Sequence, residues 1–469
     1  MLVVNQGFSA RYLLRSKIFD ILKKSGLKIV ILSPAAFDKN FTQEFSGDKI
    51  FHELYRPQKY RDINSKIYQF FTQAYFLSFK NIYKNNCTNY WRSKRFYSSS
   101  SPLRKLSNTI LKLVIFFLNR SEACRKIFIK IESLITSQVH KNIFKKYKPD
   151  LLLINSVGVL PYDRFIMQEA KKNDSKVLSL ILSWDNTTTK GLAGASVDYA
   201  IAWTNKMYRE LVDFHDVDPK KIFIGGVAQY DDYFETTRLM TKDSLIRKFN
   251  ISKDKKIIFY CLESPTSYKH NPKVLEILAE KILSGSISSP CQLIVRPHPI
   301  YFRSDNGRSI YEEDLKELEG IKKQYPFVIF DYPEILENNI NHDMPSTESL
   351  KLGALLKYSD VVLSFYSSMA IEASIFNTPI INVELFDRHN ISNKIVANHA
   401  HNKRVLSTGG VKSASNINDL VKFINDYLND PSLDDAGRKR IIEQETGPNK
   451  GNAAYEIANH IVSLVNNFR

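Results

Sequence analysis

The sequence predicts an α/β protein with two doubly wound domains, each built on a parallel β-sheet. Short β-branched runs alternate with longer amphipathic stretches, which is the pattern of β-α-β units. This pattern begins near residue 2 and restarts after residue 231. The chain has 469 residues, which is long enough to bury a core in each of two such domains.

The individual strands and helices follow from these runs. In the first half, strands are predicted at 2–5, 28–33, 150–155 and 176–182, with a helix at 11–24. In the second half, strands are predicted at 256–261, 292–295, 327–330, 361–364 and 379–383, with helices that include 273–283 and 349–358. A last helix is predicted at 452–468, because apolar residues from Ala453 to Val465 recur at helical spacing. We therefore expect domains at 1–235 and 236–451, followed by a C-terminal helix at 452–469.

The composition is that of a globular protein with a strong positive charge. Hydrophobic residues make up 43% of the chain and charged residues 25%, which excludes wholesale disorder and collagen-like or coiled-coil chains. The net charge of +17 favours an anionic partner, such as nucleic acid, membrane headgroups or a phosphorylated substrate. Because the sequence contains no named nucleic-acid-binding module, no nucleic-acid partner is expected.

The cysteines and the N-terminus favour a cytoplasmic location. Four cysteines, Cys87, Cys124, Cys261 and Cys291, are scattered without metal-ligand spacing, so neither a disulfide framework nor a metal site is expected. The first residues lack a basic segment followed by an apolar one, so no signal peptide is expected. The longest apolar run, at 113–118, is shorter than the roughly 20 residues that cross a bilayer.

A basic insertion at about 76–147 interrupts the first domain. Between 76 and 130 it has twelve lysines and arginines against one acidic residue, Glu122, and aromatic residues such as Trp91 and Phe116 lie among them. A basic, aromatic and amphipathic stretch suits an anionic membrane surface. The alternative is a helical insertion that packs on the first domain with its charges solvated.

The most informative motif is Arg296-Pro297-His298-Pro299, which directly follows a predicted strand. The prolines restrict the backbone and hold the imidazole beyond the carboxyl end of the sheet, where ligands of doubly wound sheets bind. Arg296 and His298 in this place suit a diphosphate or a phosphate leaving group. The alternative is a histidine that only caps a neighbouring helix.

A second motif follows the fourth strand of the second set. This strand ends at Ser364, and a polar turn with Tyr366, Ser367 and Ser368 leads into a helix that contains Glu372. Hydroxyl and free N–H groups at a helix N-terminus bind anions, and a carboxylate one turn later suits sugar hydroxyls. The alternatives are an ordinary N-cap by either paired serine and a capping role for Glu372.

Together these motifs resemble the second domain of GT-B glycosyltransferases. More closely, the His-Pro motif followed about seventy residues later by paired serines resembles two groups of families. They are the CDP-glycerol glycerophosphotransferases of teichoic-acid assembly and the bacterial capsule transferases for Kdo and sialic-acid-type sugars. In those families these residues contact donor phosphates, so the resemblance implies this role for His298, Ser367 and Ser368. It also implies two Rossmann-like domains that face each other across a cleft, with a C-terminal helix that crosses back.

The resemblance places the loop after the first strand on the acceptor side of the cleft. This loop contains Gly7, Ser9 and Arg11, and Gly7 permits close approach of a ligand to the backbone. Asn186 and Lys190, in a polar loop after the strand at 176–182, are further acceptor-binding candidates. The alternative for the first loop is a plain turn. For the second loop it is an N-cap or an Asx turn made by Asp185 for the segment that follows.

Two carboxylates are candidates for the general base that activates an acceptor hydroxyl. Asp185, in the polar loop after 176–182, is the first candidate, and Glu263, in a loop that faces the donor in GT-B enzymes, is the second. In the same loop as Glu263, the hydroxyl groups of Ser264 and Thr266 suit donation to a phosphate.

With these residues, the resemblance implies a metal-independent cytoplasmic transferase of bacterial surface polysaccharide synthesis, held near the inner face of the membrane by its basic insertion. It would move a sugar from a CMP-, CDP- or UDP-linked donor to a lipid-linked or growing glycan, as in capsule or lipopolysaccharide. The alternatives are transfer of a polyol phosphate from a CDP donor, a GT-B-like nucleotide-sugar 2-epimerase and a non-catalytic scaffold. The epimerase needs more acids and histidines around the cleft than the sequence reveals.

Overall fold

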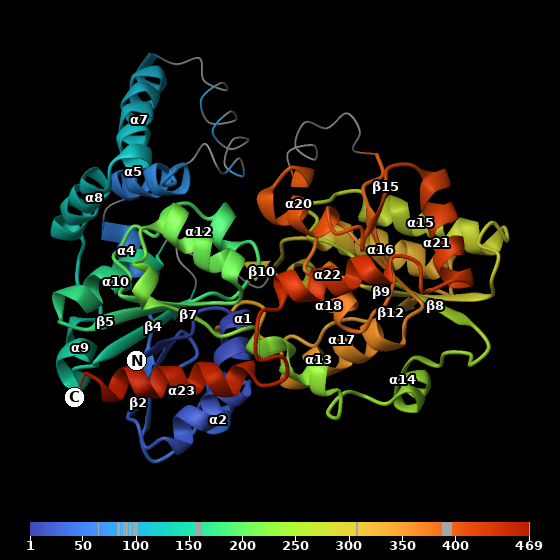
Figure 1. Ribbon diagram of the computed structural model, residues 1–469, viewed down its shortest axis with the longest axis horizontal. Coiled ribbons are helices and arrows are strands. Elements are labelled where there is room, and N and C mark those ends of the chain that lie inside the picture. Colours follow the sequence, from blue (N-terminus) through green and yellow to red (C-terminus); the bar gives the residue numbers. More distant parts are fainter. Residues whose placement is uncertain are drawn as a thin grey trace.

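The chain forms two lobes, each with a central parallel sheet covered by helices (Figure 1). This computed structural model describes residues 1–468 apart from 64, 82–84, 86, 88–91, 93–95, 97–101, 156–161, 306–307 and 387–395. Several residues of the predicted basic insertion, among them Trp91, lie outside the described residues. The predicted domain boundary at 235/236 falls between the two sheets and stays a prediction.

The first sheet has seven parallel strands in the order β3-β2-β1-β4-β5-β6-β7. The strands are β1 (Leu2–Val3), β2 (Ile29–Ser33), β3 (Ile50–Leu54), β4 (Leu151–Asn155), β5 (Lys176–Leu180), β6 (Tyr199–Ala202) and β7 (Ile222–Ile224). Strands β1, β2 and β4 are buried along their whole length, as expected for parallel strands covered on both faces. Strand β3 was not predicted, because its half-buried residues include His52 and Glu53 and lack a continuous apolar run.

The second sheet has six parallel strands in the order β12-β9-β8-β13-β14-β15. These strands are β8 (Lys256–Cys261), β9 (Cys291–Arg296), β12 (Ile329–Phe330), β13 (Val361–Ser364), β14 (Ile380–Val383) and β15 (Lys412–Ala414). All five predicted strands of this half are present, and β15 is an unpredicted edge strand. A short antiparallel pair, β10 (Ser304–Asp305) and β11 (Arg308–Ser309), lies outside the sheet.

Helices cover both sheets and extend one lobe outward (Figure 1). Those of the first lobe are α1 (Gly7–Ser9), α2 (Lys17–Lys24), α3 (Lys39–Glu44), α4 (Gln58–Ile63), α5 (Ser65–Phe76), α7 (Pro102–Arg120), α8 (Glu122–Ile135), α9 (Lys141–Tyr147), α10 (Asp163–Lys172), α11 (Asn186–Thr189) and α12 (Asn205–His215). Those that follow are α13 (Asp231–Glu235), α14 (Lys242–Phe249), α15 (Asn271–Leu283), α16 (Glu312–Gln324), α17 (Ser346–Tyr358), α18 (Met369–Ile375), α20 (Ala400–Leu406), α21 (Ile417–Asn429), α22 (Asp435–Glu445) and α23 (Ala453–Asn466).

The helix predicted at 11–24 is interrupted. The segment Ala10–Leu14 forms a π-helical turn, and α2 begins only at Lys17. Ser16 causes the break, because its side chain accepts a hydrogen bond from the Ile18 N–H and so caps a new helix. The break leaves Arg11 in the short π-helical turn, separate from α2 and shortly after β1 in the chain.

The C-terminal helix crosses back to the first lobe, as predicted. Helix α23 packs against α2, at the lower left of Figure 1. Its N-terminus is held by Asp231, whose carboxylate accepts hydrogen bonds from the Ala453 and Ala454 N–H groups at 3.0 and 2.8 Å. Gly226, with a φ of +86°, lets the chain at Pro448 approach closely, since a Cβ there would lie 2.2 Å from the Pro448 carbonyl oxygen.

A buried ion pair and a backbone hydrogen bond join the two lobes near β1. The Arg15 side chain is 3% exposed and binds the fully buried carboxylate of Asp343 in the second lobe. The Gly7 N–H donates to the Asn341 carbonyl at 2.9 Å. A Cβ on Gly7 would lie 2.0 Å from the His342 carbonyl oxygen, so the space that we expected a ligand to use is filled by the second lobe itself.

Replacing Gly7 by alanine is therefore expected to destabilise the chain. The added methyl group overpacks against the His342 backbone, which should lower the free energy of unfolding by about 1–3 kcal/mol. Urea unfolding measures this change. The matched control is Gly320→Ala on α16, where a Cβ meets no atom within 4 Å and the change should be neutral or stabilising. Equal losses in both variants would contradict the inferred packing.

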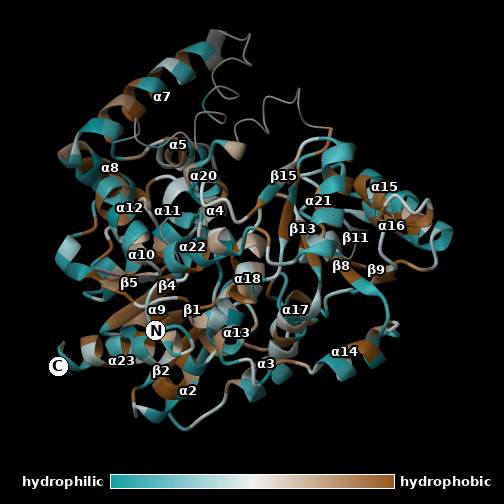
Figure 2. Ribbon diagram, turned by 45° about the vertical axis from the view of Figure 1, so that its right-hand side comes forward, coloured by the Kyte–Doolittle hydropathy of each residue, from teal (hydrophilic) through white to brown (hydrophobic). Residues whose placement is uncertain are grey.

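Helices α7 and α8 form an arm that reaches away from the first sheet (Figures 1 and 2). One face of α7, with Leu111, Ile115 and Leu118, packs on α5. The described residues contain no helix long and apolar enough to cross a membrane. Both helices nevertheless carry large exposed apolar side chains, namely Leu106, Ile110, Leu113, Phe116, Phe117, Ile127, Ile131, Leu134 and Ile135.

Candidate functional site

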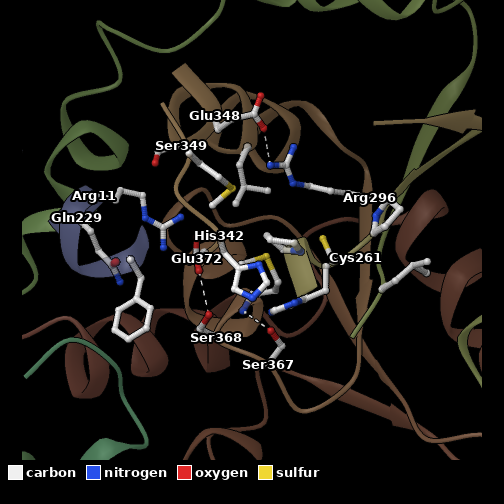
Figure 3. Close-up of a pocket in the computed structure, with 18 of the residues that line it drawn as sticks. Arg11, Gln229, Cys261, Arg296, His342, Glu348, Ser349, Ser367, Ser368 and Glu372 are labelled. Atoms are coloured by element: carbon white, nitrogen blue, oxygen red, sulfur yellow. Dashed lines mark hydrogen bonds and ion pairs between the residues drawn. The ribbon is translucent and has the colours of Figure 1, made fainter. Parts of the chain in front are cut away.

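A cavity of about 280 Å³ lies between the two lobes, at the carboxyl ends of the central strands (Figure 3). In both sheets the strand order reverses beside the first strand, between β1 and β4 and between β8 and β13. Doubly wound sheets bind ligands at such switch points. The loops that follow β1, β8, β9 and β13 all reach the cavity, and they carry Arg11, Glu263, His298 and Ser367.

His298 presents one ring nitrogen to the cavity as a hydrogen-bond donor. Its Nδ1 accepts a hydrogen bond from the Ile300 N–H at 3.1 Å and so caps the short helical turn at Pro299–Phe302. The proton of the neutral ring must then be on Nε2. Although solvent reaches the side chain, enclosure by the cleft, with His342, Arg11 and Arg296 nearby, lowers its pKa to about 4. His298 is therefore both a helix cap and a neutral donor in the cavity.

The paired serines lie at the start of α18 and line the same cavity. The Ser367 hydroxyl accepts a hydrogen bond from the Met369 N–H at 3.4 Å, which leaves its own proton available. The Ser368 hydroxyl donates to the Glu372 carboxylate at 3.0 Å, which is a contact between side chains, and the Ser368 side chain makes no capping hydrogen bond to the backbone of α18. Figure 3 shows both serines beside His342 and Glu372.

Arg296 does not have the role that we expected for it. Its guanidinium is buried and binds both Asp331 and Glu348, the latter at 2.7 Å. Lys351 joins the same two carboxylates at 2.7 Å each, so the four side chains form a closed ionic network. Arg296 lines the cavity, but its charge is already neutralised, and the interpretation as the phosphate-binding cation needs correction.

Arg11 is the arginine that suits the phosphate-binding role expected of Arg296. It comes from the first lobe and points into the cavity from the side opposite Arg296 (Figure 3). Among the residues that the structure describes, no carboxylate lies within ion-pair distance of its guanidinium, although it acts electrostatically on Glu372. We expected Arg11 to contact the acceptor, whereas its position beside His298 and the serines suits an anionic group that bridges the lobes.

Glu263 is the carboxylate with the properties of a base. It lines the cavity, and burial, reinforced by the charge of Asp185, raises its pKa to about 7 against the effect of the Ser264 N–H that donates to it at 3.0 Å. At neutral pH a carboxylate with a pKa near 7 is still largely ionised, and it is also basic enough to accept a proton.

Asp185, the first candidate from the sequence, has a different environment. Burial opposes its ionisation, but Lys190, His401 and hydrogen bonds from Ser183 and Thr189 lower its pKa to about 2. It does not line the cavity. These hydrogen bonds make Asp185 a weak proton acceptor that organises its own loop, so the geometry favours Glu263 as the base.

Several other predicted site residues lie outside the cavity. Ser364 is buried in β13, and the Tyr366 hydroxyl donates to Glu384 beside it. The hydroxyl groups of Ser264 and Thr266 form a hydrogen bond with each other, with 2.8 Å between their oxygens, and neither residue lines the cavity. The same holds for the remaining acceptor candidates, which are Gly7 in the contact between lobes, buried Ser9, and Asn186 and Lys190 next to Asp185.

The sequence analysis missed His342 and Tyr233. His342, with a left-handed φ of +56°, enters the cavity from the loop that docks on Gly7, and burial lowers its pKa. The Tyr233 hydroxyl donates to Glu372 at 3.2 Å. Glu372 is buried, which raises its pKa. His342 is in a loop without periodicity or motif, so no sequence signal could have identified it.

No family model matches the chain, and no curated protein does. Solved structures are similar in fold. They include S. aureus MnaA with UDP (12% identity, 99% of this chain and 96% of that chain, TM-score 0.53). The UDP-GlcNAc 2-epimerase of Neisseria meningitidis bound to UDP-GlcNAc has 12% identity, 98% and 99% coverage and a TM-score of 0.53. That of Methanocaldococcus jannaschii in complex with UDP-GlcNAc and UDP has 13% identity, 98% coverage of both chains and a TM-score of 0.51. The chain thus has the GT-B fold that its motifs predicted.

Proposed function

We propose that the chain is a glycosyltransferase that moves a sugar from a nucleotide-activated donor to a lipid-linked or growing surface polysaccharide. The observation that carries the proposal is the cavity between the lobes, where Arg11 of the first lobe faces His298 and Ser367 of the second. A cation and neutral hydroxyl and imidazole donors suit a diphosphate. The similarity in fold to structures that hold UDP or UDP-GlcNAc supports a nucleotide sugar as the ligand.

The same geometry supports a mechanism for sugar transfer. The bond between the sugar anomeric carbon and the donor phosphate oxygen breaks, and a bond to the acceptor oxygen forms. Glu263 takes the proton of the acceptor hydroxyl. Arg11, His298 and Ser367 stabilise the negative charge that develops on the leaving nucleotide, so this transfer does not depend on a metal in the cavity.

A nucleotide-binding panel tests the proposal. Calorimetry with CMP, CDP, UDP, GDP and ADP, without added metal, should show selective binding of one of them. Selective binding of CMP indicates a Kdo- or sialic-type donor, CDP favours transfer of a polyol phosphate, and UDP or GDP indicates an ordinary sugar donor. Binding of none of them would overturn the proposal and favour a scaffold.

The second candidate function is a nucleotide-sugar 2-epimerase. Besides Glu348, which is paired with Arg296 and Lys351, the cavity is lined by two carboxylates, Glu263 and Glu372, and two histidines, His298 and His342. The sequence-based objection that acids and histidines are too few therefore no longer holds. Incubation with UDP-GlcNAc in deuterated water and without acceptor separates the candidates. An epimerase incorporates deuterium at C2 of the sugar, whereas a transferase leaves C2 unlabelled and consumes its donor when acceptor is added.

We further propose that the arm of α7 and α8 holds the enzyme on an anionic membrane, where a lipid-linked acceptor resides. Leu106, Ile110, Leu113 and Phe117 lie three and four residues apart and so form one exposed stripe on α7. Exposed basic residues, among them Lys105, Lys112 and Arg120, are also on α7, and Lys126 and Lys130 are exposed on α8. Apolar side chains flanked by basic ones suit the headgroup region of an anionic bilayer.

Exchanging the four residues of this stripe for glutamine is expected to weaken binding to liposomes that contain anionic lipid by about tenfold or more. The variant lacks the apolar side chains whose transfer from water into the bilayer favours binding. Co-sedimentation measures this affinity, which should also fall with added salt. The matched control exchanges Leu283 and Leu433, which are exposed outside the arm. If the stripe variant sediments like the control, the arm is a packing element only.

A further inference from the structure

A group of potential metal ligands lies outside the nucleotide cavity, between the two lobes. Cys87 comes from the insertion of the first lobe, and His399 and His401 come from the start of α20 in the second. One ligand atom from each lies within 4.8 Å of the others. We propose that these three side chains bind a Zn²⁺ ion that fastens the insertion to the second lobe.

The cysteine sulfur lies close to both histidines. The N–H of Ala400, which stands between them in sequence, and the Thr188 hydroxyl both hydrogen-bond to this sulfur. The Cys87 N–H donates to the Asn85 side-chain oxygen at 3.0 Å, and the Asn85 amide donates to the Thr188 carbonyl at 2.8 Å. These bonds fix the buried cysteine against α11 and direct its sulfur at the histidine pair.

The ring of His401 is oriented as it is in many metal sites. His401 Nδ1 lies 3.2 Å from the Thr188 hydroxyl oxygen, which itself lies 3.1 Å from the Asp185 carbonyl oxygen. A ring protonated on Nδ1 has its lone pair on Nε2, where a metal can bind, and a hydrogen bond to the other nitrogen is the usual support of such a ligand. Trp184 packs edge-on against the ring, with centroids 4.8 Å apart.

The chemistry of this group favours zinc. One thiolate and two imidazoles are typical ligands of this ion, which leaves a fourth position for water. With bonds of about 2.0–2.3 Å, tetrahedral ligand atoms lie roughly 3.5 Å apart, so the ion would draw the group together by about an ångström. The Asp185 carboxylate acts electrostatically on both histidines and would offset the charge of the ion. Binding releases the Cys87 thiol proton to solvent.

The sequence analysis expected no metal site, and this group shows why. Ligand motifs are recognised by short spacing, whereas Cys87 and His399 belong to different halves of the chain. They come together only because the two lobes pack against each other in the folded chain. The site does not line the nucleotide cavity, so its test is independent of the proposed function.

The full-length protein is stripped with chelator and titrated with Co²⁺, a spectroscopic substitute for zinc, and the product is then challenged with Zn²⁺. We expect one Co²⁺ per chain, a sulfur-to-cobalt charge-transfer band and displacement by one equivalent of Zn²⁺. Cys87→Ser should abolish the band, and His401→Ala should lower the affinity at least tenfold. The matched controls, Cys124→Ser and His460→Ala, change residues outside the group and should behave like wild type.

A second measurement needs no variant. Bound Zn²⁺ should slow alkylation of Cys87 by a maleimide at least tenfold in the wild-type chain, as read by peptide mass spectrometry, and should leave alkylation of Cys124 unchanged. Substoichiometric metal uptake or an unchanged band in Cys87→Ser would overturn the proposal.

Discussion

Glu263→Gln is expected to lower kcat by about 10²–10⁴-fold, the usual contribution of a general base, while the affinity for the donor changes little. Glutamine has the shape of glutamate, and its side-chain oxygen can still accept the hydrogen bond from the Ser264 N–H. The variant therefore removes the proton acceptor without opening the cavity. Turnover assays combined with donor titration by calorimetry measure the two effects separately.

The pH dependence identifies the base. Burial raises the pKa of Glu263 to about 7, so below that pH the protonated form dominates and kcat should fall about tenfold per pH unit. Glu263→Gln should lose this dependence. Asp185→Asn is the comparison, because a carboxyl group with a pKa of about 2 is ionised throughout this range and its loss should leave the dependence in place. If Asp185→Asn removes the dependence and Glu263→Gln retains it, Asp185 is the base.

Much of the fold could be predicted from the sequence, because parallel strands covered on both faces are continuous apolar runs. The five runs predicted in the second half all became strands. Strand β3 escaped, since its residues are half-buried and carry His52 and Glu53, and helix 11–24 was predicted as continuous although Ser16 caps a new helix inside it. These differences arise where local hydrogen bonds compete with hydrophobic periodicity.

The site was predictable where a residue directly follows a strand. His298, Ser367 and Glu263 belong to loops at the carboxyl ends of neighbouring strands, so the topology brings them together. Partners from other elements were not predictable. Asp331 and Glu348, which neutralise Arg296, come from a separate strand end and from α17, and no feature of the Arg-Pro-His-Pro motif announces them. The sequence could show that an arginine is present, but not whether its charge is available.

The difference in available charge between Arg11 and Arg296 predicts a large effect on nucleotide binding. Arg11→Gln is expected to weaken binding of the preferred nucleoside diphosphate by about 10–100-fold, which corresponds to the roughly 1.5–3 kcal/mol of a hydrogen bond to a charged group. Arg11 has this weight because the other arginine of the cavity is occupied by two carboxylates, and because enclosure by the cleft lowers the pKa of His298 to about 4, which leaves its ring neutral at pH 7. Calorimetry at low and high salt measures the loss, which should shrink as salt screens the charge.

Two comparisons separate the role of Arg11 in binding from a role in folding. Arg247→Gln, on the exposed face of α14, should leave both affinity and stability unchanged. Arg296→Gln should instead lower the free energy of unfolding by about 3–5 kcal/mol, because it leaves Asp331 and Glu348 buried with only Lys351 to neutralise them. If Arg11→Gln binds the diphosphate as tightly as wild type, the donor phosphates do not contact Arg11. The donor would then lie in the cavity in a different orientation from the one proposed.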